Sequence, residues 1–262
     1  YVVTADSNNI TDNRINTDGI QRQWGIYLAT NADSNRIINN NITTNGPGTG
    51  GTNYGIELVT CASNVIANNT IVTSGTTGNY GIYLATTSDN NAILNNTIFT
   101  NGTTTNNWGV YITQSSTNNV TDNVIVTNGT TGNYGIYLLT SANGNLIQSN
   151  NITASGTTTN YGVFLSTASS NKIYANNITA SGITKTGATN NRGVYVVTNS
   201  ITNDIANNSI WTHGGATNIG LYFLTDSNGN NATGNNITTN GGSTTNYGAL
   251  VSASTSNLIN FN

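Results

Sequence analysis

The sequence of 262 residues predicts an all-β fold, a single-stranded parallel β-helix (a solenoid) of about ten coils. Three observations support this prediction. The pattern N-x-I-x-x-N-x-I, with Val or Ala allowed for the first Ile, returns about every 27 residues along the whole chain. Each copy is accompanied by a phrase such as Y-G-I-Y-L-A-T at 80–86. No segment shows the 3.6-residue spacing of apolar residues that is typical of a helix.

Each repeat unit contains three short segments that we expect to be strands. The first is the Y-G-I-Y-L-A-T phrase, the second is an N-x-I segment, and the third is an N-x-I-x-T segment. β-Branched and aromatic residues fill these segments, and Asn, Gly, Ser and Thr bound them, as is typical of strands joined by turns. Stacked on their own copies, the segments form parallel strands about 4.8 Å apart. We expect one domain over residues 1–262, without evident caps.

Asparagine recurs at two fixed positions in every repeat and so forms two columns. We expect both columns to point inward at corners of the coil. An inward amide without a partner costs about 1–3 kcal/mol, whereas stacked amides can each donate to the next coil. The first column is Asn8, Asn35, Asn64, Asn91, Asn118, Asn145, Asn171, Asn203, Asn230 and Asn257. The second column is Asn13, Asn40, Asn69, Asn96, Asn123, Asn150, Asn176, Asn208, Asn235 and Asn262.

Glycine also recurs at two places in each unit. One lies in the Y-G-I phrase, as at Gly81, and the other precedes a variable loop, as at Gly75. We expect both at corners where the backbone needs a positive φ or a close approach to a neighbour.

This repeat resembles that of right-handed parallel β-helix proteins, the architecture shared by pectate lyases and many secreted or archaeal surface proteins. The resemblance covers essentially all of residues 1–262 and implies a right-handed solenoid. It implies little about activity, because the same fold carries lyases, hydrolases, adhesins and structural proteins.

Composition excludes several classes of function. Only 6% of the residues are charged and the net charge is −3, so no cluster of Lys and Arg is present to neutralise the phosphates of a nucleic acid. No apolar run approaches the length of a membrane span. Methionine is absent, even at position 1, so we expect a mature or trimmed chain that has lost any targeting segment. The single cysteine, Cys61, excludes an internal disulfide framework.

The outward side of the phrase is the first place to look for chemistry. In each coil one aromatic residue between the inward Ile and Leu faces outward. Glu57 takes this place in one coil and is the sole ionisable group there apart from tyrosines. General acid–base catalysis needs two groups within reach of one bond, so we expect no catalytic residue, no enzyme activity and no cofactor. The column is Tyr1, Tyr27, Tyr83, Tyr111, Tyr137, Phe164, Tyr195 and Tyr222.

Other polar residues have simpler interpretations. Asp6, Asp33 and Asp89 fall at similar turn positions, where they either hold a weak cation or stabilise the turns, and the turn interpretation is favoured. His213 takes a place filled by Asn or Ser in most other coils, and Cys61 takes a place of small residues. Metal-ligand spacing is absent, so we expect no metal site.

N-x-S/T sequences supply candidate N-glycosylation sites. We expect them at outward places or in loops, where a glycan fits. They are Asn41, Asn68, Asn95, Asn101, Asn128, Asn151, Asn177, Asn207 and Asn236.

These observations lead to one leading hypothesis about function. The aromatic column makes an apolar outer face that another copy of the chain would cover. The first and last coils lack caps, so either flanking regions have been trimmed or the end coil of another copy serves as the cap. We therefore expect a non-enzymatic structural subunit of an extracellular filament, sheath or cell-surface layer. Its partners would be copies of itself, head to tail and laterally, together with covalent glycans, and neither nucleic acid nor membrane.

Two alternatives compete with this hypothesis. In the first, the chain is a carbohydrate-binding or polysaccharide-processing β-helix whose tyrosines stack on sugar rings. In the second, it binds ice through a flat array of threonine, which the bulky residues Val72, Phe99 and Trp211 interrupt.

Overall fold

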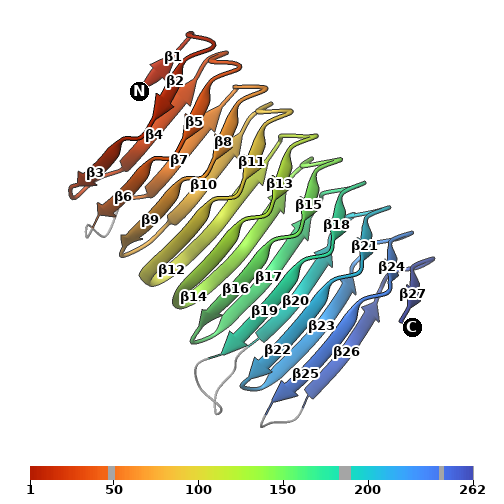
Figure 1. Ribbon diagram of the computed structural model, residues 1–262. Coiled ribbons are helices and arrows are strands. Elements are labelled where there is room, and N and C mark those ends of the chain that lie inside the picture. The colour runs from red at the N-terminus through yellow and green to blue at the C-terminus, as the bar shows by residue number, and fades with distance from the viewer. Residues whose placement is uncertain (47–50, 183–189, 242–244, 262) are drawn as a thin grey trace.

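The chain folds as a right-handed parallel β-helix in the computed structural model, which describes residues 1–46, 51–182, 190–241 and 245–261 (Figure 1). Strands follow one another along a rod, from β1 at the red end to β27 at the blue end. Every strand pairing is parallel, as each strand lies beside its equivalents in the coils before and after it. Over the described residues, no helix has the length and apolar character needed to cross a membrane.

The N-x-I segments form a sheet of ten strands, which we call the β5 wall. Its strands are β2 (Asn9–Thr11), β5 (Arg36–Ile38), β8 (Val65–Ala67), β11 (Ala92–Leu94), β13 (Asn119–Thr121), β15 (Leu146–Gln148), β18 (Lys172–Tyr174), β21 (Asp204–Ala206), β24 (Asn231–Thr233) and β27 (Leu258–Asn260).

The N-x-I-x-T segments form a second wall, the β6 wall. Its strands are β3 (Arg14–Asp18), β6 (Asn41–Gly46), β9 (Thr70–Gly75), the first part of β12 (Thr97–Thr113), the first part of β14 (Val124–Leu139), β16 (Asn151–Gly156), β19 (Asn177–Gly182), β22 (Ser209–Gly214) and β25 (Asn236–Gly241).

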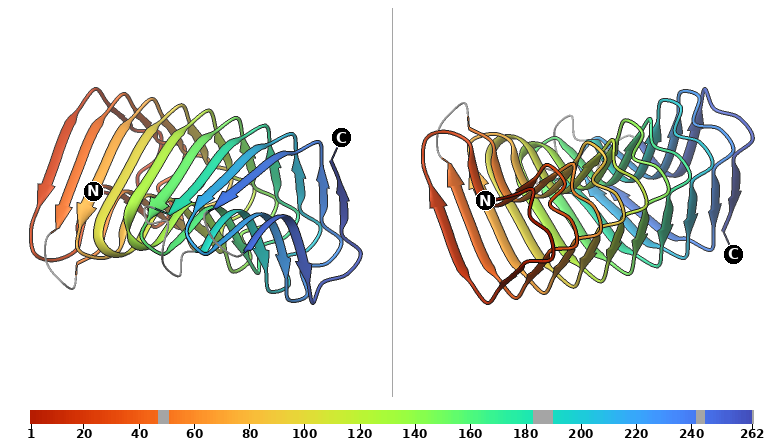
Figure 2. Two further views of the ribbon diagram at one scale, coloured as in Figure 1. Left: turned by 90° about the horizontal axis from the view of Figure 1, so that it is seen from below. Right: turned by 90° about the horizontal axis from the view of Figure 1, so that it is seen from above.

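The aromatic phrases form the third wall, the β4 wall, which β12 and β14 join to the β6 wall without a break. Its strands are β1 (Val2–Val3), β4 (Gln23–Ala29), β7 (Asn53–Val59), β10 (Asn79–Ala85), the later parts of β12 and β14, β17 (Thr159–Ser166), β20 (Asn190–Val197), β23 (Thr217–Leu224) and β26 (Thr245–Ser252). The views in Figure 2 show the coils stacked along one axis.

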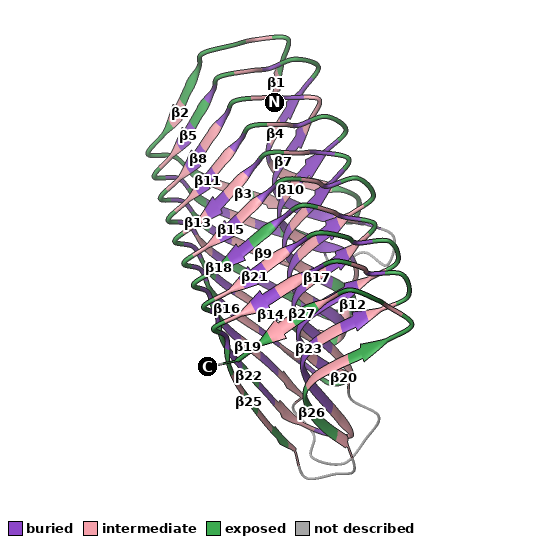
Figure 3. Cartoon of the chain, turned by 90° about the vertical axis from the view of Figure 1, so that its right-hand side faces the viewer, coloured by how far each residue is buried: buried purple, intermediate pink, exposed green. Residues whose placement is uncertain are grey.

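The core lies between the three walls. In each central coil the phrase contributes two inward aliphatic residues, such as Ile82 and Leu84, and each of the other walls contributes one, such as Ile93 and Ile98. All four side chains are fully buried. Figure 3 shows the buried stretches along the strands, with exposed stretches at many of the corners. Burial of such side chains stabilises a fold by about 1.5–3 kcal/mol each, which accounts for a stable rod from short strands.

The two predicted asparagine columns are confirmed as ladders. Asn123 is a typical member: its Oδ1 accepts from the backbone N–H and from the Nδ2 of Asn96, at 2.8 and 3.0 Å. Its own Nδ2 donates to Asn150 Oδ1 at 3.0 Å and to the Ile93 carbonyl at 2.9 Å. The ladders extend into the first coil, where Asn8 and Asn13 donate to Asn35 and Asn40. Asn262 lies outside the described residues.

A third ladder runs inside the rod, at the start of the β4 wall, and sequence reasoning missed it. Its members precede the phrase by one residue, and each Nδ2 donates to the next Oδ1 at 2.9–3.0 Å. The signal was present in the sequence, because an Asn stands two places before nearly every phrase glycine. The members are Asn53, Asn79, Asn107, Asn133, Asn160, Asn191, Asn218 and Asn246.

Positive φ and close approach, the two reasons expected for glycine, fall at different places in the coil. Many corners have positive φ, yet Thr, Asn, Ser and Asp hold most of these places, as Thr86 (φ 49°) and Asn95 (φ 53°) illustrate. The phrase glycine is required for close approach, which was one of the two expected reasons. A Cβ on Gly109 would lie 2.2 Å from Ile125 Cγ2 and 2.6 Å from the Gly135 carbonyl oxygen.

Candidate functional site

The predicted aromatic column forms on the outer side of the β4 wall. Neighbouring rings stack nearly parallel, with centroids 4.7 Å apart for Tyr83 and Tyr111 and 4.7 Å apart for Tyr137 and Phe164. The column continues through Tyr195 to Tyr222, with a centroid separation of 5.2 Å at that step. The parallel register of the strands places equivalent residues over one another and so builds the stack.

A second aromatic column lies beside the first, and sequence reasoning missed it. It consists of the residues directly before the phrase glycines in six consecutive coils: Trp24, Tyr54, Tyr80, Trp108, Tyr134 and Tyr161. Strict alternation along a strand would turn this residue inward with the Ile two places later. The phrase breaks that alternation because the glycine faces Ile of the β6 wall while the following Ile also points into the core. Both aromatic residues of each phrase therefore face outward.

The two columns contact each other edge to face. Trp108 and Tyr137 have ring centroids 5.0 Å apart at an interplanar angle of 80°, and Tyr134 and Phe164 lie 5.3 Å apart at 72°. Within the second column Tyr80 stacks on Trp108 at 4.6 Å and Tyr134 on Tyr161 at 4.9 Å. Parallel and edge-to-face contacts are the favoured geometries of aromatic pairs. We call the two columns together the aromatic face.

The phenols of the aromatic face are neutral over a wide pH range. Burial raises the pKa of Tyr137 to about 12 and raises the pKa of Tyr80, Tyr83 and Tyr134 further, because the crowded rings remove water from the hydroxyl groups. Neighbouring phenols add to the increase, since a second phenolate close by is repelled. At neutral pH the face thus presents uncharged rings, most of them half-buried, with hydroxyl groups that can donate or accept hydrogen bonds.

One end of the aromatic face holds an acid. Glu57 interrupts the first column between Tyr27 and Tyr83, and its Oε2 accepts a hydrogen bond from the Trp24 indole nitrogen. Its side chain is buried, with 7% of the residue exposed. Burial raises the pKa of Glu57, although the Trp24 hydrogen bond and the nearby Arg22 charge oppose this increase. Arg22 itself lies 5.6 Å from the centre of the Trp24 ring.

The other end holds a cation, Arg192. Arg192 interrupts the second column, where it follows Tyr161 and precedes Ile219. Its guanidinium carbon lies 3.9 Å from the centre of the Tyr195 ring, and its Nη1 donates to the Tyr161 hydroxyl at 3.0 Å. The aromatic face therefore runs from an acid at one end to a cation at the other.

The remaining polar candidates do not gather into a site. The carboxylate of Asp33 accepts from the Ala62 N–H at 2.7 Å, and Asp6 and Asp89 accept from the next coil in the same way, which supports the turn interpretation. His213 lies on the β6 wall with its ring 4.3 Å from that of Trp211, and Cys61 is fully buried in the core. Across the described ranges, no three side chains of His, Cys, Asp and Glu come together as a metal site requires.

All nine candidate glycosylation asparagines are exposed, as expected of outward positions. Asn95 Nδ2 donates to Asn68 Oδ1 at 2.7 Å, and Asn177 Nδ2 donates to Asn151 Oδ1 at 3.1 Å. Their modification stays a prediction.

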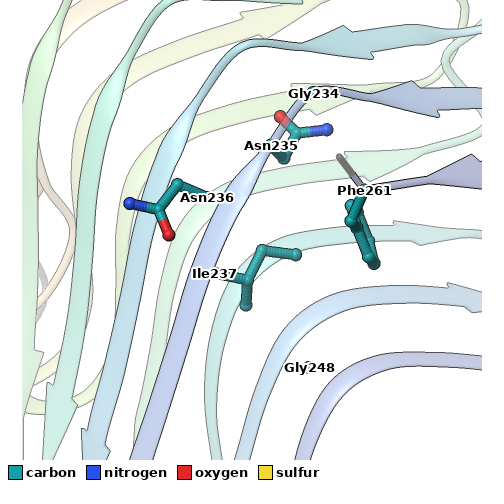
Figure 4. Close-up of a pocket in the computed structure, with 6 residues that line it drawn as sticks. All are labelled: Gly234, Asn235, Asn236, Ile237, Gly248 and Phe261. Carbon is teal, nitrogen blue, oxygen red and sulfur yellow. The ribbon is translucent and has the colours of Figure 1, made fainter.

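A hollow of about 340 Å³ lies in the last coils, and no residue of the aromatic face lines it. Figure 4 shows its lining residues, which are Gly234, Asn235, Asn236, Ile237, Gly248 and Phe261. It offers backbone, amide and apolar groups but no ionisable side chain.

Comparison with protein families gives the decisive observation. The model of the NosD family, described as periplasmic copper-binding protein (NosD), matches residues 49–181 and 95–249, which together span most of the chain. The chain belongs to the NosD family. Among curated proteins no match was found for this NosD-family chain.

Solved structures with the same architecture share little sequence with this chain. A variant of the periplasmic alginate epimerase AlgG matches with a TM-score of 0.49 and 13% identity, over 95% of this chain and 77% of that one. AlgG itself matches with a TM-score of 0.44 and 12% identity, over 96% and 76%. The enzymatically active domain of tailspike protein 2 of bacteriophage CBA120 matches with a TM-score of 0.39 and 13% identity, over 90% and 39%.

Two expectations from the sequence are wrong in the light of these findings. The matched family and structures are described as a copper-binding protein, an epimerase and an enzymatically active domain. They contradict both the prediction of a filament or surface-layer subunit and the prediction that the chain is not an enzyme. Sequence reasoning interpreted the apolar outer face as a contact with a second copy of the chain, and it overlooked the second column of rings. Contacts with further copies of the chain stay a prediction.

Proposed function

We propose that this NosD-family chain binds a polysaccharide along its aromatic face and takes part in processing it. The observation that carries the proposal is the pair of stacked aromatic columns on the outer side of the β4 wall. The rings follow one another at 4.6–5.8 Å from Tyr80 to Tyr161, so they offer a continuous platform and not an isolated pocket. Such a platform suits an extended ligand made of repeated units.

The chemistry of the face matches that of a sugar. Tyrosine and tryptophan combine an apolar ring with a polar tip, so one residue can contact the C–H groups of a sugar ring and hydrogen-bond its hydroxyl groups. The rings are held by their neighbours before any ligand arrives, which reduces the entropy lost on binding. The phenols are neutral donors at physiological pH, and their raised pKa values extend this state to higher pH.

Glu57 supports a second candidate function, proton transfer to or from the bound glycan. A carboxyl group whose pKa is raised by burial can remain protonated at a pH where an ordinary glutamate is ionised, and this is the property of a general acid. Glu57→Gln keeps the shape of the side chain and its acceptor oxygen for Trp24. Proton transfer by Glu57 predicts that this variant binds the glycan as before and loses turnover, whereas unchanged turnover would exclude the role.

The cellular location follows from the same proposal. The family description and the AlgG structures name periplasmic proteins. We propose that this chain likewise works outside the cytoplasm, in the cell envelope or beyond it, where polysaccharides accumulate. Exposure at the cell surface is the finer form of this proposal.

Copper, which the family description names, does not fit the residues of this chain. Proteins bind copper through soft Cys and Met ligands or through clustered imidazoles. This chain has no Met, one His and one Cys. The thiol of Cys61 is sealed in the core, where burial raises its pKa, and His213 lies on the β6 wall. We therefore derive no step of the function through copper.

The chain offers a matched pair of tryptophans for a direct test. Trp108 lies on the aromatic face, and Trp211 lies on the outer side of the β6 wall, where 46% of it is exposed. Screening the chain against a panel of polysaccharides identifies the ligand, and affinity electrophoresis or titration calorimetry then compares the variants. Trp108→Ala should weaken binding at least tenfold, which is about 1.4 kcal/mol, and Trp211→Ala should leave it unchanged. Equal loss in both variants, or loss in Trp211→Ala alone, would contradict the proposal.

A further inference from the structure

The cation on the aromatic face lies in a long segment without acidic residues. Residues 123–203 contain no Asp or Glu but include Lys172, Lys185 and Arg192, although the whole chain has a net charge of −3. The other cations, Arg14, Arg22 and Arg36, all lie in the first coils, among most of the acidic residues. The charge of the rod therefore changes sign along its length, and Arg192 brings the positive part to the aromatic face.

Arg192 is fixed in place by aromatic rings on three sides. The guanidinium carbon lies 3.9 Å from the centre of the Tyr195 ring and 5.0 Å from the centres of the Tyr161 and Tyr222 rings. The Tyr161 hydroxyl accepts from Nη1 at 3.0 Å. A cation held on aromatic faces in this way is attracted by the negative charge of the ring faces. A flexible side chain thus becomes a pre-oriented group.

The charge of Arg192 has no counter-charge on the face. Its neighbours in the column are Tyr161 and Ile219. The phenols around it are neutral at physiological pH, and burial raises the pKa of Tyr161 and Tyr195 further above that range. The Nε–H group is covered and has no acceptor among the described residues. At the opposite end of the face, by contrast, Arg22 is near Glu57. Tyrosine hydroxyl groups accept hydrogen bonds from the guanidinium without neutralising it, so the positive charge remains for a ligand.

We infer that Arg192 is a subsite for an acidic group on the bound glycan, so that the polysaccharide is an anionic one. This inference rests on the proposed function and names the class of substrate. An acidic group at the guanidinium would receive charge-assisted hydrogen bonds, and the Tyr161 hydroxyl, which accepts from Nη1, keeps its own proton to donate. The surrounding rings exclude water, which strengthens the attraction between opposite charges. The neighbouring sugar rings lie over Phe164, Tyr137 and the rings beyond them.

A carboxylate sugar and a sulfated sugar share this chemistry, and three probes of equal length separate them from neutral sugars. The probes are oligogalacturonate, a sulfated galactan oligosaccharide and an uncharged galactan oligosaccharide, each titrated into the full chain. We expect the matching anionic probe to bind at least tenfold more tightly than the neutral one, with an affinity that falls as salt is added. Lowering the pH to about 3 removes the charge of most carboxylates but not that of sulfates, so it identifies the group that Arg192 binds.

The decisive variant is Arg192→Tyr, because Tyr fills this column in the preceding coil and keeps the face aromatic. It should abolish the preference for the anionic probe and leave the affinity for the neutral probe unchanged or higher. Arg192→Lys should retain part of the preference, since it keeps the charge without the fork of donors. Arg36→Gln, on the exposed side of the β5 wall, is the matched control and should change neither affinity.

The possible failures are distinguishable. If no oligosaccharide binds, or if Trp108→Ala leaves binding intact, then the proposed function itself is wrong. If glycans bind and Trp108→Ala weakens them, but Arg192→Tyr keeps the anionic preference, then the proposed function stands and the Arg192 subsite is overturned. Equal affinity of the wild-type chain for neutral and anionic probes would overturn the subsite as well.

Discussion

The inner and outer sides of the same strands follow opposite rules in this molecule. Inside, a column repeats one residue, as Asn79, Asn107, Asn133 and Asn160 show. Outside, the aromatic columns change from coil to coil, and they admit Glu57 in one and Arg192 in the other. Both sides have the same strands, spacing and register, so the backbone is not the source of the difference.

The difference teaches where function can reside on a solenoid. An inner amide both donates to and accepts from its neighbours, so one substitution leaves partners unsatisfied in two further coils. An outer ring contacts its neighbours by stacking, which tolerates another ring, a guanidinium or an acid. We conclude that the inner columns specify the fold and that the exceptions in the outer columns specify the ligand.

The largest effect is expected from a matched pair of asparagine substitutions. Asn123→Leu removes the acceptor of the Asn96 amide and the donor to Ile93 and Asn150, in a fully buried ladder. It should lower the free energy of unfolding by about 3 kcal/mol or more, at roughly 1–3 kcal/mol for each orphaned group. Asn128→Leu makes the same change on the exposed side of β14 and should be nearly neutral. Thermal and denaturant unfolding of both variants measure the contrast, and equal melting temperatures would remove the distinction between the two sides.

A smaller effect is expected when the outer rings are ionised. The pKa of Tyr137 in the folded chain is about 12, against an ordinary value of 10.0. Because the folded pKa is raised, the neutral Tyr137 phenol contributes to the free energy of unfolding. This contribution is fully present below pH 10 and is lost as the pH rises towards 12. Absorbance of the phenolate should therefore appear late and together with unfolding. Early ionisation of all tyrosines near pH 10 in a folded chain would show that the face is open to water.

A still smaller effect is expected from Glu57. Burial raises the pKa of Glu57 in the folded chain, so the fold favours the protonated carboxyl group. The contribution of this group to stability is therefore greatest below the unfolded pKa of about 4.3, and it is lost as the pH rises through the folded pKa. Glu57→Gln removes this titration. The melting temperature of the variant should exceed that of the wild type more at pH 7 than at pH 4. A difference that does not depend on pH would mean that Glu57 titrates normally.

No measurable effect is expected from copper. With one His, one buried Cys and no Met in the chain, neither Cu(I) nor Cu(II) should bind stoichiometrically or raise the melting temperature. Equilibrium dialysis with metal analysis checks this, with His213→Ala as the control variant. Tight one-to-one binding that His213→Ala abolishes would contradict this prediction, because it would show a copper site that includes His213.

The repeat period predicted the fold well because it reports the inner columns. Asn64 and Asn69 recur in strict step since each must meet its copy in the next coil, and the walls follow from that register. The same logic would have found the Asn53 ladder, whose first coil holds Gln23 in place of Asn. These are local and periodic features, which a single sequence records directly.

The aromatic face was only half predicted. The rule of alternation gave Tyr83 correctly and left the direction of Tyr80 unpredicted. Applied to Tyr80 it would turn that ring inward, because it takes no account of two successive inward residues at Gly81 and Ile82. The places of Arg192 and Glu57 depend on rings contributed by neighbouring coils, and the pattern of one coil does not contain that information. The apolar outer column and the end coils without caps had favoured a filament, and the comparisons overturned that prediction.

A crystal structure of the chain with a bound oligosaccharide tests the central claim most directly. The account predicts sugar rings stacked along the aromatic face, over residues such as Tyr83, Tyr111 and Tyr137, with the glycan running parallel to the rod. An oligosaccharide bound elsewhere, for example against Trp211 on the β6 wall, with the aromatic face left bare, would contradict it.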